Sequence, residues 1–133
     1  MAIDPTQAVG ATPRGRALRL AFGHEAVTPG RARQLVAELL GADALAEDLR
    51  LVVSELVTNA IVHTDDGGEL RLLDGRPASP VRVEVEDHDP NVPDVHVVQR
   101  DCGGQGLQIV GRLAQRWGVE PTGHGKFVWA ELG

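Results

Sequence analysis

The sequence is poor in cysteine and in aromatic residues. Cys102 is the only cysteine among 133 residues, and tyrosine is absent. A single cysteine excludes an internal disulfide, and it predicts a reducing, cytoplasmic location. Because aromatic residues make up 3% of the chain, we expect a core built from Leu, Val and Ala.

Long apolar runs and an excess of basic charge are also missing. No stretch approaches the roughly 18 to 20 apolar residues of a membrane-spanning helix. The N-terminus lacks the basic start and apolar block of a secretory signal. The 13 Lys and Arg are scattered against 19 Asp and Glu, which gives a net charge of −6. We therefore expect neither a membrane nor a nucleic acid as the main partner.

The length and the composition predict one globular domain. The chain is 42% hydrophobic and 24% charged, which is typical of a soluble fold with a single core. Residues 1–15 show no periodicity and are expected to form a flexible N-terminal leader. Residues 16–133 are expected to form the single domain.

Hydrophobic periodicity predicts the elements of that domain. Thr28 and Pro29 suit a helix start, and Gly41 suits its end. The expected strands are 17–22, 69–73, 81–86, a short one at 118–120, and the closing "GKFVWAELG"; the expected helices are 28–40, 43–63 and 106–117. Neighbouring strands with short links favour antiparallel or mixed pairing. We therefore predict an α/β two-layer sandwich, with helices on one face of a mixed β-sheet.

The stretch "SELVTNAIVH" places three polar side chains in one row on the second helix. Glu55, Asn59 and His63 follow one another at a spacing of four residues, so they stack along one helix face and border the apolar stripe. A carboxylate beside an amide suits a hydrated divalent cation, and a carboxylate can accept a proton from an attacking hydroxyl. A solvated helix edge would accept the same residues, so the row by itself leaves both interpretations open.

Two later stretches contain further candidate binding residues. Asp87 ends the strand of "VRVEVEDHDP", where it can accept a hydrogen bond from an exocyclic amine or simply start a turn. Gly103, Gly104 and Gly106 precede a helix in "CGGQGLQIV", where backbone amides and the helix dipole attract anions. Neither a P-loop nor a G-x-G-x-x-G pattern is present. The long connection between them, 87–104, is of the length that functional loops have.

In this order and spacing the motifs resemble one superfamily. "LVVSELVTNAIVH", "VRVEVEDHDP", "GGQGLQIVGRLAQRWGV" and "GKFVWAEL" are similar to the nucleotide-binding domain of gyrase, a heat-shock chaperone, histidine kinases and mismatch-repair ATPases. Within this GHKL superfamily the chain is most similar to the small anti-sigma-factor serine kinases. The resemblance extends from about Leu18 to Leu132 and implies the Bergerat ATP-binding fold.

The resemblance implies ATP and Mg²⁺ as ligands and assigns roles to individual residues. Asn59 would hold Mg²⁺ against the triphosphate, and Glu55 would be the base that activates a serine hydroxyl or a water. Asp87 would bind the adenine amino group. The remaining implied ATP contacts are His63 near the phosphates, a phosphate cradle of Gly103, Gly104, Gly106 and the Leu107 amide, and a lid over 89–103. Such a set fits phosphoryl transfer, which depends on metal and positioning.

The chain departs from the superfamily pattern at two places. After Asp87 the usual D-x-G-x-G is replaced, because Asp89 and Pro90 stand where glycine would give the adenine room. In the last strand, Lys126 and Phe127 stand where a small hydroxyl residue commonly follows the glycine. Lys126 would either supply charge to a phosphate or point into solvent.

Three functions remain open from the sequence. The leading one is an ATP-dependent serine kinase that phosphorylates an anti-sigma antagonist protein and sequesters a sigma factor, with a homodimer implied by the family. The second is a regulatory module that binds proteins and binds nucleotide weakly or not at all. The third is a metal hydrolase using His63, Asp65 and Asp66 with His88 or His124, although this spacing matches no zinc pattern.

Overall fold

The computed structural model describes residues 8–12, 15–23, 25, 28–64, 67–88 and 105–133. Within these residues the chain forms three helices and six strands. In chain order they are β1 (Ala8–Thr12), β2 (Gly15–Phe22), α1 (Thr28–Leu40), α2 (Ala46–His63), β3 (Gly68–Asp74), β4 (Val81–Asp87), α4 (Gln105–Leu113), β5 (Arg116–Pro121) and β6 (Lys126–Leu132).

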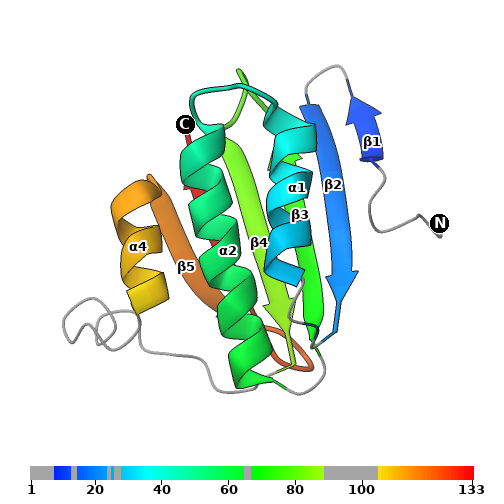
Figure 1. Ribbon diagram of the computed structural model, residues 1–133, viewed down its shortest axis with the longest axis vertical. Coiled ribbons are helices and arrows are strands. Elements are labelled where there is room, and N and C mark those ends of the chain that lie inside the picture. The colour runs from blue at the N-terminus through cyan, green and yellow to red at the C-terminus, as the bar shows by residue number, and fades with distance from the viewer. Residues whose placement is uncertain (1–7, 13–14, 24, 26–27, 65–66, 89–104) are drawn as a thin grey trace.

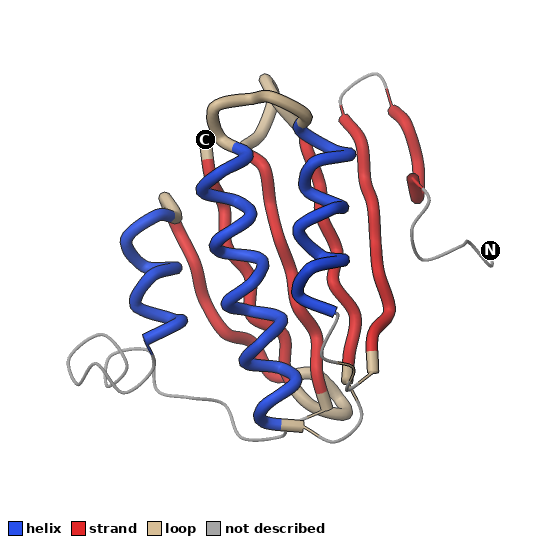
Figure 2. Tube along the Cα trace, viewed as in Figure 1, coloured by secondary structure: helices blue, strands red, loops and turns tan. Residues whose placement is uncertain are grey.

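The strands form one sheet in the order β1-β2-β3-β4-β6-β5. All three helices lie on the same face of this sheet (Figures 1 and 2). This arrangement confirms the predicted two-layer α/β sandwich. Every described pairing is antiparallel, however, so the expected mixed sheet is not what forms. The short links β3–β4 and β5–β6 make hairpins, and a hairpin can only pair its strands in opposite directions.

Strand β1 lies inside the segment that was expected to be an irregular leader. Ala8–Thr12 pairs with β2 at the edge of the sheet, with Ala11 opposite Arg16. The sequence "AVGAT" shows no alternation that would predict a strand. Its partner is the edge of β2, which offers unpaired backbone groups to any neighbouring segment. The pairing therefore depends on the assembled sheet.

The core lies between the sheet and the helices. In β4 the inward residues Val81, Val83 and Val85 are fully buried, as the alternation predicted. They belong to one apolar cluster with Val52 and Leu56 of α2. Leu, Val and Ala make up nearly all of this cluster, which agrees with the scarcity of aromatic residues. None of the described helices is long and apolar enough to cross a membrane.

The helix ends follow the expected chemistry with one shift. Gly41 ends α1 with φ of 59° and donates its N–H to the Ala37 carbonyl at 2.8 Å. Helix α2 begins at Ala46 instead of near Asp43. The Asp43 carboxylate accepts the backbone N–H of Leu45 at 2.9 Å, so it holds the turn before the helix.

Helix α4 is shorter than its apolar spacing predicted. It ends at Leu113, and Trp117 belongs to β5, not to the helix. The backbone N–H of Gln115 donates to the Glu131 carbonyl of β6 at 2.8 Å, so strand pairing takes over there. The Trp117 indole still lies close to Gly111 of α4. An apolar residue just beyond a helix can thus reach the same surface from a strand, and spacing alone cannot distinguish the two.

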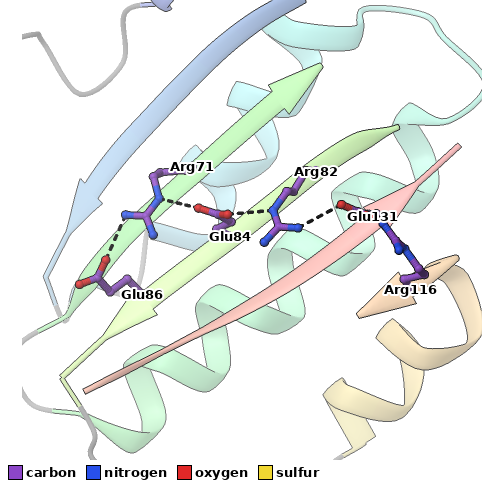
Figure 3. Close-up of polar contacts among 6 residues, drawn as sticks. All are labelled: Arg71, Arg82, Glu84, Glu86, Arg116 and Glu131. Carbon is purple, nitrogen blue, oxygen red and sulfur yellow. Dashed lines mark hydrogen bonds and ion pairs between the residues drawn. The ribbon is translucent and has the colours of Figure 1, made fainter. Parts of the chain in front are cut away.

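The opposite face of the sheet carries a chain of ion pairs instead of helices (Figure 3). Glu84 accepts hydrogen bonds from Arg71 at 2.9 Å and from Arg82 at 2.8 Å. Arg82 also contacts Glu131 at 3.0 Å, and Arg116 contacts the other oxygen of Glu131. The network links β3, β4, β6 and β5 across the strands.

Candidate functional site

Three elements with predicted site residues converge at one end of the molecule. The C-terminal ends of α2 and β4 lie at this end, and α4 points its N-terminal end toward it (Figure 1). Helix α2 packs against both β4 and α4. The fold therefore brings to one end segments that are separated in the sequence.

Glu55 and Asn59 lie at the border between the core and the surface of α2. Both side chains are half-buried, whereas Leu56 and Ala60 are buried and Thr58 is exposed. This is the border position that the helical spacing predicted. The third member of the row, His63, is the last residue of α2, and its side chain lies outside the described part of the structure. The catalytic and magnesium-binding roles of the row stay predictions.

Asp87 is the last residue of β4 and faces the helix side of the sheet. It continues the buried alternation of Val81, Val83 and Val85, and it is 3% exposed. Its cross-strand partner in the register of β4 and β6 is Lys126, which is 7% exposed. The Lys126 Nζ lies 3.2 Å from Asp87 Oδ1 and 3.1 Å from Oδ2. Asp87 and Lys126 therefore form a buried ion pair.

This pair decides between the two expectations for Lys126 only in part. Its side chain is buried against a carboxylate and does not point into solvent, and the contact with a phosphate stays a prediction. The sequence held only a weak signal of the pairing, namely that each residue stands at the end of an apolar strand. Which two strand ends meet is decided by the sheet order, which places β6 beside β4.

Glycines hold the backbone tightly around this ion pair. A Cβ on Gly125 would collide with the carbonyl oxygen of Asp87, and a Cβ on Gly68 would collide with the carbonyl oxygen of Glu86. Gly68 also lies opposite Asp87 in the register of β3 and β4. The two positions that lie against the end of β4, 68 and 125, must therefore be glycine. This close packing leaves Asp87 little freedom to move relative to β3 and β6.

The predicted phosphate cradle is described only in part. Gly106 and Leu107 lie in the first turn of α4, and the Leu107 side chain is buried in the core. Gly103 and Gly104 lie outside the described residues, as do Asp89, Pro90 and the rest of the expected lid. The N-terminal end of a helix is electropositive, which agrees with anion binding, but the cradle itself stays a prediction.

A surface pocket that the sequence did not predict opens on the other face of the sheet. It has a volume of about 400 Å³ and is lined by Ala21, Phe22, Gly68, Glu69, Glu86 and His88. Glu69 and Glu86 both accept hydrogen bonds from Arg71, at 3.0 and 3.1 Å. In the sequence, Glu69 and Glu86 alternate with apolar residues, and this alternation could have placed both carboxylates on the outer face of the sheet, where the pocket lies. Asp87, between Glu86 and His88, faces the opposite side.

The described residues give no support to the third function, a metal hydrolase. Asp65, Asp66 and the His63 side chain lie outside the described part of the chain. His88 and His124 are both exposed. Among the described residues, no group of three or more His, Cys, Asp or Glu side chains is arranged to hold a metal ion.

Comparison with known families identifies the class of protein. The profile described as "Histidine kinase-like ATPase domain" matches residues 24–132, from the segment before α1 to the end of β6. The chain therefore belongs to the histidine kinase-like ATPase domain family. This membership confirms the resemblance at the level of the superfamily and supports ATP binding. A search among curated proteins finds no match to this chain.

Proposed function

We propose that the protein is an ATP-dependent serine kinase that phosphorylates an anti-sigma antagonist protein and sequesters a sigma factor. The observation that carries this proposal is the position of Glu55 and Asn59, which are half-buried in the C-terminal half of α2, the helix that ends at the same end of the molecule as β4. The family match supports the nucleotide-binding part, and the kinase and partner assignments rest on the resemblance of the motifs.

The residues of α2 have the chemistry that a bound Mg²⁺ and the phosphates of a nucleotide would require. The Asn59 amide oxygen is a hard ligand of the kind that Mg²⁺ prefers. Glu55, one turn earlier on the same face, is suited to accept the proton of a serine hydroxyl. Bound Mg²⁺ would neutralise the charge on the transferred phosphoryl group, and α2 would position the groups around it.

Phosphate transfer from labelled ATP to the antagonist tests this function. We expect Glu55→Ala to lower the transfer rate by about 100-fold or more, the usual contribution of a general base. Glu38→Ala is the matched control, because Glu38 is an exposed carboxylate on α1. Unchanged phosphate incorporation in Glu55→Ala would remove Glu55 from the catalytic role.

A second function is favoured by the ion pair between Asp87 and Lys126. A carboxylate that is already paired has less to offer a nucleotide base, which suits a regulatory module that acts by protein contact. Calorimetric titration with ATP and Mg²⁺ separates the two functions. No heat at millimolar ATP would favour the module, whereas micromolar binding of ATP would favour the nucleotide-binding kinase.

A further inference from the structure

We propose that Lys126 is a specificity-determining residue of the nucleotide site: its ammonium occupies the position on Asp87 that the exocyclic amine of adenine would take. The protein then binds purine nucleotides with little preference for adenine. This inference rests on the proposed nucleotide-binding function, and it adds that the base is not selected by its amino group.

The geometry of the pair carries the inference. The Lys126 Nζ lies at nearly equal distances from the two oxygens of Asp87, 3.2 and 3.1 Å. A nitrogen at this position stands in front of the carboxylate and contacts both of its acceptors. A primary amine that hydrogen-bonds to the same carboxylate needs the same space. Lys126 and an adenine amine therefore compete for one acceptor.

Burial and charge decide that competition in favour of Lys126. Both side chains are almost fully buried, and a buried carboxylate is strongly stabilised by an opposite charge. The adenine amine is neutral, so it would replace a charge-assisted hydrogen bond with a weaker one. It would also leave the ammonium without its partner carboxylate. Exchange of the two donors is therefore unfavourable.

The backbone keeps the pair in place. Asp87 and Lys126 face each other in the register of β4 and β6, and Gly125 packs directly against the Asp87 carbonyl. Neither strand end has room to withdraw its side chain by a backbone shift.

The consequence for base selection follows from the chemistry of the purines. Guanine carries a carbonyl oxygen where adenine carries the amine, and a free carboxylate would repel that oxygen. With the carboxylate engaged by Lys126, adenine gains no hydrogen bond from Asp87 and guanine meets no free negative charge. Binding then depends on the phosphates and the metal, which are the same in ATP and GTP.

Nucleotide titrations of the full chain test the inference. Dissociation constants for ATP and GTP with Mg²⁺, and for purine riboside triphosphate, which lacks the amine, are measured by calorimetry. In the wild type we expect the three constants to agree within about threefold. Lys126→Met removes the ammonium from the Asp87 carboxylate. We therefore expect the preference of this variant for ATP over GTP to rise by about tenfold or more, as is typical of a site that selects its ligand by a hydrogen bond.

Two further variants serve as controls. Arg82→Met removes a cation and its two ion pairs, with Glu84 and Glu131, from the opposite face of the sheet, and we expect all three constants to stay as in the wild type. Asp87→Asn/Lys126→Met removes both members of the buried pair, and we expect it to show no preference for ATP. If Lys126→Met fails to fold, the wild-type comparison of ATP with purine riboside triphosphate still tests the inference.

The outcomes separate this inference from the proposed function. A wild type that prefers ATP tenfold over both other nucleotides would overturn the inference and leave nucleotide binding intact. Equal weakening of all three by Lys126→Met would overturn it too, because it would place Lys126 on the phosphates. ATP binding gained only in Lys126→Met would also overturn it, because the wild type would then bind none of the three nucleotides. No binding in any variant would end the proposed nucleotide function, and the inference with it.

Discussion

The guanidinium of Arg82 lies over the indole ring of Trp129, 4.5 Å from the ring centroid, and at the same time pairs with Glu84 and Glu131. Arg82 thus connects three groups on the uncovered face of the sheet. We expect Arg82→Ala to lower the free energy of unfolding by about 1 to 2 kcal/mol, because a cation–π contact and charge-assisted hydrogen bonds are lost together. Urea denaturation measures this change.

The loss is expected to stay moderate because the network has other cations. Glu84 keeps Arg71, and Glu131 keeps Arg116. Arg112→Ala is the control, since Arg112 is an exposed cation on α4, and we expect it to change the free energy of unfolding by less than about 0.5 kcal/mol. Equal effects of the two substitutions would show that the network contributes nothing beyond surface charge.

The acid sensitivity of the protein is expected to depend on the same carboxylates. Hydrogen bonds from Arg116 and Arg82 hold the pKa of Glu131 below its usual 4.5. Burial raises the pKa of Glu84, but hydrogen bonds from Arg71 and Arg82 outweigh it, so this pKa is also lowered. A carboxyl whose pKa is lowered by folding stabilises the protein above its unfolded pKa. That stabilisation is lost as the pH falls through the folded value.

The free energy of unfolding should therefore decrease below a pH of about 4.5. Glu131→Gln cannot titrate, so we expect its difference from the wild type to be largest at neutral pH and to shrink in acid. Urea denaturation at several pH values measures both curves. Parallel curves for the two proteins would contradict this assignment.

The two faces of β3 offer a test of the register. Leu72 is fully buried and Leu73 is 39% exposed, although they are neighbours in the same strand. We expect Leu72→Ala to cost about 2 to 5 kcal/mol, because it leaves a cavity between the sheet and the helices. Leu73→Ala should cost less than about 1 kcal/mol. The reverse order would mean that β3 is paired one residue out of register.

Substitutions at two glycines with positive φ distinguish the cost of a strained backbone conformation from the cost of a steric collision. Gly41 has φ of 59° with open space around it, whereas Gly67 has φ of 74° and lies against the backbone of Phe22. Gly41→Ala should cost about 1 to 2 kcal/mol for the left-handed conformation alone. Gly67→Ala adds a collision with the Phe22 carbonyl, so we expect a cost larger by at least about 2 kcal/mol. Thermal unfolding of both variants tests the difference.

The sequence predicted the elements best where a regular period reaches the core. The apolar residues of α1, among them Leu35 and Val36, are buried as their spacing indicated, and so are the alternate valines of β4. The end of α4 was predicted wrongly, and β1 was not predicted, because it lies in the segment expected to be a flexible leader. Trp117 satisfies a helical stripe and a strand equally well, and β1 has no apolar pattern at all.

The candidate site was predictable in its helical half and only partly in its sheet half. Glu55 and Asn59 share a helix face because four residues make about one turn, and no tertiary contact is needed to know it. The partner of Asp87 is 39 residues away, so no local rule could name it.

The amino-acid order by itself determined which residues face inward on each helix and strand, because the periods of 3.6 and 2 fix side-chain direction along a continuous segment. Only the tertiary structure decided which strand ends became neighbours. Placing β6 beside β4 brought Lys126 against Asp87 and buried both charges together. Strand order is settled by the packing of the whole sheet, and the pairing of distant charges follows from it.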